Sequence, residues 1–126
     1  MGKVSLLDLS EPVRIGADAF RELQASLGPE GSSAVVERVV IDIAEKIGLA
    51  ERALAADDLA TLAQAARRLT AISQQLGLGL LAQVAADARA CAERGDRVAL
   101  HAVTGRLLRV GDASLTMAMD GSEQAP

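Results

Sequence analysis

The chain has 126 residues, a length that suits one domain. Alanine and leucine dominate and Phe20 is the only aromatic residue, so helix formers far outweigh strand formers. The net charge of −4 argues against a general affinity for nucleic acid. A single cysteine, Cys91, and a single histidine, His101, give no ligand cluster for zinc and no His-rich metal site, and no metal is expected.

Residues 1–15 are expected to form a mixed lead-in to the domain. They lack an apolar core of signal-peptide length, and no apolar run in the chain approaches the roughly 18 residues of a membrane span. The sequence therefore predicts a cytoplasmic protein without a membrane segment. A short helix is expected at 16–27, with Phe20, Leu23 and Leu27 on one face, and Gly28-Pro29 is expected to end it.

The next two helices are expected at about 30 or 33 to 55 and from Asp58 to Gly77. Asp57 and Asp58 form a candidate N-cap pair, and Gly77 suits a left-handed helix end. Apolar residues recur at spacings of three and four, which is the helical period. The inward residues of these helices are expected to be Val36, Val39 or Val40, Ile43, Ile47, Ala50, Leu54, Leu59, Leu62, Ala66, Leu69, Ser73 and Leu76.

Two further helices are expected at 80–94 and from Asp96 to about 118, joined by the stop and restart of Gly95-Asp96. Gly105 and Gly111 each weaken the last helix by about 1 kcal/mol relative to alanine. Residues 119–126 are expected to be a disordered tail. Short connections make consecutive helices neighbours, so 16–118 is predicted to be an all-α, antiparallel up-and-down four-helix bundle with a short extra N-terminal helix. The inward residues of the last two helices are expected to be Leu81, Val84, Ala88, Cys91, Leu100, Val103, Leu107 and Val110.

The sequence shows none of the usual enzyme signals. There is no strand followed by a glycine-rich phosphate loop, and one histidine and one cysteine form no recognisable nucleophile pair. Cys91 falls on the apolar stripe and is expected to be a core residue. We therefore expect a protein that is not an enzyme and that has no cofactor.

The run "ALAADDLATLAQAARRLTAISQQLGLGLLAQVAADARACAERGDRVAL" resembles the histidine-containing phosphotransfer (HPt) family of bacterial phosphorelays. In that family the motif reads roughly His-x-Leu-Lys-Gly, then small or polar residues, then Leu-Gly, and later Gly-Asp. The matching positions, in order, are the Asp pair, the Ala before the site, Leu69, Leu76-Gly77, Leu81 and Gly95-Asp96. The resemblance implies a four-helix bundle that displays a phosphoacceptor histidine in the middle of a helix.

The signature residues of the family are absent here. Arg67 stands at the position that matches the phosphoacceptor histidine, Thr70 at that of the lysine and Ala71 at that of the glycine. A guanidinium is protonated at physiological pH and has no free lone pair to attack phosphorus. The resemblance therefore implies a degenerate HPt-like module without phosphotransfer at the usual site.

Helical geometry places Arg67 about 100° from the inward stripe and Arg68 about 200° from it. Arg67, Thr70, Ala71 and Gln74 then form an exposed strip at three- and four-residue spacing, called the arginine strip below. The resemblance implies that a receiver domain or a histidine kinase docks there, and that Arg67 pairs with acidic groups of the partner and inhibits phosphotransfer. A plain alternative is that both arginines only solvate a helix face.

Two other functions stay open at this point. His101 is expected at the surface of the last helix, where an imidazole can act as a nucleophile, so the chain would then be an active histidine phosphotransfer protein. The third hypothesis is a structural bundle that forms a homodimer through a second apolar stripe with Leu108 and Leu115.

Overall fold

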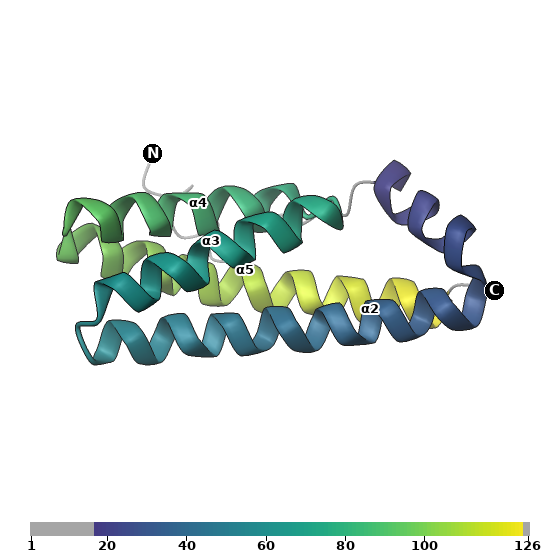
Figure 1. Cartoon of the computed structure of the whole chain (residues 1–126), viewed down its shortest axis with the longest axis horizontal. Helices are drawn as coiled ribbons and strands as arrows, with labels where there is room; N and C mark the ends of the chain where they lie inside the picture. The colour runs from purple at the N-terminus through teal and green to yellow at the C-terminus, as the bar shows by residue number, and fades with distance from the viewer. Residues whose placement is uncertain (1–16, 125–126) are drawn as a thin grey trace, which may run out of the picture.

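The computed structural model describes the backbone of residues 17–124 and the side chains of residues 34–119. It contains four helices, which are α2 (Ala17–Ala55), α3 (Leu59–Gln75), α4 (Gly79–Arg94) and α5 (Arg97–Gln124). The described part of the chain has no strand, and its helices run alternately up and down (Figure 1). The predicted all-α four-helix bundle is confirmed.

Each helix packs against its neighbours in the chain, and the last helix closes the ring. α3 contacts α2 and α4, α4 contacts α5, and α5 returns to α2. This order is the one that short connections impose on an antiparallel bundle. Among the described residues, no helix is both long and apolar enough to cross a bilayer.

The connections use the residues that the sequence indicates. Gly77 and Gly95 have φ values of 72° and 68°, the left-handed conformation that glycine adopts without a Cβ clash. The amide of Leu78 then donates to the carbonyl of Ser73 at 2.8 Å, which pairs a carbonyl that the end of α3 would otherwise leave free. At the start of α5, the Asp96 carboxylate accepts a hydrogen bond from the Ala99 amide at 3.1 Å.

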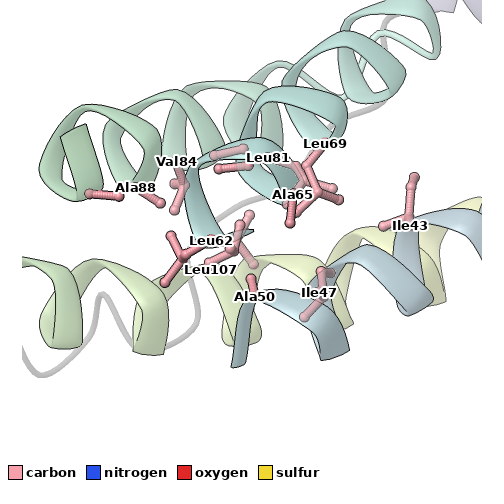
Figure 2. Packing of buried hydrophobic residues seen from close by; sticks show 14 of the residues in the cluster. Ile43, Ile47, Ala50, Leu62, Ala65, Leu69, Leu81, Val84, Ala88 and Leu107 are labelled. Atoms are coloured by element: carbon pink, nitrogen blue, oxygen red, sulfur yellow. The ribbon is translucent and has the colours of Figure 1, made fainter. Parts of the chain in front are cut away.

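The core lies between all four helices and consists mainly of leucine and alanine. Ile43 and Ala50 of α2, Leu62 and Leu69 of α3 are fully buried. Figure 2 shows side chains from the four helices directed toward a common centre. The predicted inward residues are confirmed as buried in most positions, Cys91 included. The exceptions, all half-buried, are Val39, Val40, Leu54, Leu59 and Val103. The labelled core residues of Figure 2 are Ile43, Ile47, Ala50, Leu62, Ala65, Leu69, Leu81, Val84, Ala88 and Leu107.

The prediction of a separate short helix at 16–27 is wrong, because the helix does not end there. Gly28-Pro29 does not end it, and α2 is one element of 39 residues from Ala17 to Ala55. Proline removes one backbone donor and bends a helix, but the hydrogen bonds on either side can still form. Figure 1 shows the consequence as a change of direction between the purple first part of α2 and its blue remainder. The lead-in 1–15 lies outside the described residues, as do the side chains of Phe20, Leu23 and Leu27.

The last helix is longer than predicted. α5 continues to Gln124, so the expected end near 118 and the expected disorder from 119 onward do not describe residues 119–124. The two glycines that were expected to weaken this helix, Gly105 and Gly111, lie within it, and Ala118 beyond them is still buried. Burial against the rest of the bundle therefore outweighs a penalty of about 1 kcal/mol per glycine.

Leu108 and Leu115, the residues of the expected second apolar stripe, are half-buried and pack against the core. Part of the apolar surface of these two leucines is thus buried inside the bundle, where a second copy of the chain could not contact it.

Candidate protein-binding site on α3

The helix α3 begins with an N-cap at Asp58. The Asp58 carboxylate accepts hydrogen bonds from the Thr61 amide at 3.1 Å and from the Thr61 hydroxyl at 2.6 Å. These bonds favour the ionised carboxylate and lower the pKa of Asp58 below its ordinary value. The N-cap predicted from the Asp pair is therefore confirmed at Asp58.

One side of α3 is buried and the other is exposed. The buried residues are Leu62, Ala65, Ala66, Leu69 and Ser73. On the opposite side Arg67, Ala71 and Gln74 are exposed, and Thr70 is half-buried. The arginine strip thus lies at the surface, as the helical spacing predicts.

Thr70 differs from the other members of the strip. Its hydroxyl donates a hydrogen bond to the carbonyl of Ala66, one turn earlier, at 2.9 Å. A threonine in this state contributes its methyl group and a free lone pair to a partner, but no available proton. The cationic and amide donors of the strip are therefore Arg67 and Gln74.

A groove of about 550 Å³ lies between α2 and α3, beside the arginine strip. Only Arg67 belongs to both features. We call this feature the cationic groove, and it is lined by Lys46 and Leu49 of α2 and by Thr61, Gln64, Ala65, Arg67 and Arg68 of α3.

The position of Arg68 corrects an expectation from the sequence. Arg68 was expected about 200° from the inward stripe and outside the arginine strip, yet its side chain lines the cationic groove together with that of Arg67. The expected angles assumed an inward stripe without Ala65, and Ala65 is 2% exposed. Its burial turns the inward face of α3 toward α2, and the long arginine side chains reach the same hollow from adjacent positions.

The electrostatics of the groove follow from the composition of α3. Arg67 and Arg68 are the only charged residues of this helix. Within the described part of the chain neither arginine forms an ion pair, whereas Lys46 is bonded to Asp42 at 3.0 Å. Two exposed guanidinium groups without carboxylates therefore face solvent next to each other.

The chemistry that these residues offer is anion binding. Guanidinium groups donate up to five N–H bonds in a fork that matches a carboxylate or a phosphoryl group. They supply no nucleophile, and neither the arginine strip nor the lining of the cationic groove contains histidine, cysteine or a carboxylate. The site as built offers cationic donors to an anionic group.

His101 lies elsewhere in the bundle. It is exposed on α5, one turn after Arg97, and it does not line the cationic groove. Arg97 donates two hydrogen bonds to the carboxylate of Asp57, at 2.7 and 3.0 Å, and so ties the α2–α3 connection to the start of α5. The bonds from Arg97, followed by its charge, lower the pKa of Asp57. Asp57 also has a φ of 56°, a backbone conformation that aspartate tolerates better than most residues.

Sequence reasoning missed most of the groove. Lys46 and Leu49 lie one position before the inward residues Ile47 and Ala50, so the helical period marks them as edge residues of α2. Thr61, Gln64 and Arg68 recur at spacings of three and four on α3. The sequence thus indicates an edge on α2 and an edge on α3, but it does not show that these two edges lie next to each other.

No family model matches the sequence, and no curated protein matches it. A solved structure does match the fold: the crystal structure of histidine-containing phosphotransfer protein B (HptB) from Pseudomonas aeruginosa PAO1. The TM-score is 0.81 at 19% sequence identity, and the match covers 89% of this chain and 96% of that chain. Nearly the whole of that protein thus has its structural counterpart here.

Proposed function

We propose that this chain is a phosphorelay protein that binds a receiver domain or a histidine kinase without carrying a phosphoryl group at the usual site. Three observations support the proposal. The fold is that of a protein named for histidine phosphotransfer, and the order of Leu69, Leu76-Gly77 and Gly95-Asp96 resembles the HPt motif. Arg67, which the resemblance matches to the phosphoacceptor, is exposed. The last observation is the one that carries the proposal.

The proposed action is competition. Arg67 lies in the middle of α3, at the position that the resemblance matches to the family's histidine, and it is not engaged in an ion pair with any described residue. A partner that docks on this surface presents acidic groups to a cation that can pair with them but cannot accept phosphorus. The partner is then occupied and phosphotransfer through it is inhibited.

The first experiment tests for phosphotransfer. The protein is incubated with receiver domains from its source organism that have been phosphorylated with acetyl phosphate, and acid-labile phosphate on the protein is then measured. We expect none on the wild-type chain. Arg67→His is expected to gain slow labelling, because it restores an imidazole without the lysine and glycine of the family. Labelling of the wild-type chain that disappears in His101→Ala would establish His101 as the acceptor and contradict the proposal.

The second experiment tests binding with the same receiver domains by titration calorimetry. Arg67→Ala is expected to weaken the complex about tenfold or more, since a charge desolvated in an interface leaves its partner unpaired when it is removed. The matched control is Arg109→Ala, which removes an exposed arginine from α5, away from the groove. Equal losses in both variants would leave only the interpretation in which Arg67 solvates the helix.

A further inference from the structure

Cations from two helices converge on the cationic groove. Lys46 comes from α2, and Arg67 and Arg68 come from α3. The ammonium group of Lys46 is bonded to Asp42, one turn earlier on α2, and Asp42 does not line the groove. Three positive groups thus border one hollow that contains no carboxylate in its lining.

Another hollow on the described surface has the opposite character. It has a volume of about 630 Å³ and runs along α2, where it is lined by Ala34, Glu37, Arg38, Val39, Ile41, Asp42 and Glu45. Three carboxylates and one arginine border it, so two neighbouring faces of α2 carry opposite charge. The net charge of −4 makes the cationic groove a local exception on an acidic molecule.

The lining also contains apolar surface. Leu49 is half-buried and Ala65 is buried, and both belong to the lining of the groove together with the cations. Thr61 and Gln64 add polar groups, although the Thr61 hydroxyl already donates to Asp58. A single small anion would fill only a small part of about 550 Å³ and would leave Leu49 uncovered.

We infer that Lys46 and Arg68 belong to the same binding site as Arg67, and that the cationic groove receives an acidic segment of a partner protein, in which at least two carboxylates flank an apolar side chain. The identity of that partner as a receiver domain or kinase rests on the proposed function, whereas the affinity of the groove for an acidic segment does not. At physiological ionic strength, salt screens charges that lie more than about 8 Å apart. A segment that enters the groove therefore interacts mainly with the nearby cations and only weakly with the negative charge of the rest of the chain. Complementary charge then fixes how the segment is oriented in the groove.

The test compares two double variants that change net charge equally. Lys46→Gln/Arg68→Gln removes two cations of the groove and leaves Arg67 in place. Arg38→Gln/Arg109→Gln removes two exposed cations outside it, one from α2 and one from α5. The neutral glutamine keeps a long polar side chain and puts no new carboxylate beside Asp42, and thermal unfolding confirms that both variants fold.

The first measurement is the titration with a receiver domain that binds the wild-type chain. The groove variant is expected to weaken that complex about tenfold or more, and the control variant by less than about twofold. If the groove variant binds like the wild type while Arg67→Ala loses affinity, the proposed function stands and the two-helix groove is wrong.

The second measurement needs no receiver. Amide signals of the labelled protein are followed by NMR during titration with a short peptide of alternating glutamate and leucine. Shifts are expected at residues 46–49 and 61–68, and they are expected to vanish in the groove variant. If they appear while no receiver domain binds, the groove is right and the proposed function is wrong.

Three other results would overturn the inference. Shifts that spread evenly over the surface would show that the peptide finds no particular site. Inorganic phosphate that produces the same shifts at lower concentration than the peptide would identify a small anion as the occupant. Shifts at the same residues on raising the protein concentration alone would identify a second copy, with its acidic hollow seated in the cationic groove.

Discussion

At the scale of single residues, burial decides what a side chain contributes. Leu69 of α3 is fully buried in the core, and Val98 is 85% exposed on α5. Leu69→Ala removes apolar contacts and leaves a cavity, and it is expected to lower the free energy of unfolding by about 2–5 kcal/mol. Val98→Ala is expected to change it by less than about 0.5 kcal/mol. Urea unfolding measures both, and a negligible effect of Leu69→Ala would contradict the position assigned to it.

The two interior glycines of α5 differ in what surrounds them. A Cβ at Gly105 would meet only Arg109 Nη1, at 3.6 Å, which is an ordinary contact. A Cβ at Gly111 would run into Ile47 Cδ1, and Ile47 is buried. Gly105→Ala is therefore expected to stabilise the protein by about 0.4–1 kcal/mol, through helix propensity and a less flexible unfolded chain.

Gly111→Ala gains the same propensity but must displace Ile47 within a packed core, which costs about 1–3 kcal/mol. The free energy of unfolding is thus expected to fall, or at best to stay unchanged. Thermal or urea unfolding of the two variants side by side checks the difference. Equal stabilisation by both would show that α5 does not approach α2 closely at Gly111.

At the scale of helices, the N-cap of α3 predicts a dependence on pH. The hydrogen bonds from Thr61 lower the pKa of Asp58 in the folded chain, so the carboxylate stabilises the fold while it is ionised. That contribution is complete above the ordinary pKa of 3.8 and is lost as the pH falls through the lower folded value. An asparagine side chain caps a helix about as well as aspartate does but has no carboxyl group to titrate.

Asp58→Asn is therefore expected to resemble the wild type near neutral pH and to lose less stability between about pH 5 and pH 2. Urea unfolding at several pH values measures this, and Asp87→Asn serves as a control that removes an exposed carboxylate of α4 without altering a cap. Parallel pH profiles of wild type and Asp58→Asn would contradict the assigned role of the carboxylate.

The same scale shows what the sequence can and cannot predict. Asp58, Gly77 and Gly95 act within one or two turns of their own helix, so local chemistry identified the ends of α3 and α4. Gly28-Pro29 is also a local signal, but it only makes a helix end more favourable, and α2 continues through it. The helix phase likewise predicted the exposure of Arg67.

The cationic groove could not be predicted in this way. Lys46 of α2 and Arg68 of α3 line one groove because the edges of the two helices that carry them meet, and Ala65 of the same lining is buried. Alanine is compatible with either a buried or an exposed position, so the sequence does not distinguish the two orientations. The cationic groove is therefore a tertiary feature, whereas the arginine strip is a property of one helix.

At the scale of the whole molecule, the helices differ in length. α3 and α4 have 17 and 16 residues, while α2 and α5 have 39 and 28. At about 1.5 Å per residue, α3 and α4 extend for roughly 25 Å, and the four-helix region cannot be longer than that. Gly111 of α5 faces Ile47 of α2 and Leu81 of α4, which places it in this region, and beyond it α5 continues next to α2 (Figure 1).

Unequal lengths predict that the molecule does not open as one unit. Amides of 62–73, 81–92 and 100–110 lie where each helix packs against both of its neighbours in the bundle, and they are expected to exchange with solvent only through global unfolding. Amides of α5 beyond Ser114 are expected to exchange faster, because this end can separate from α2 while the four-helix core stays intact. Native-state hydrogen exchange in Leu69→Ala separates the two processes. The variant should lose protection in the core by its full loss of stability and leave the far end of α5 unchanged, and an equal loss at both places would show a single cooperative unit instead.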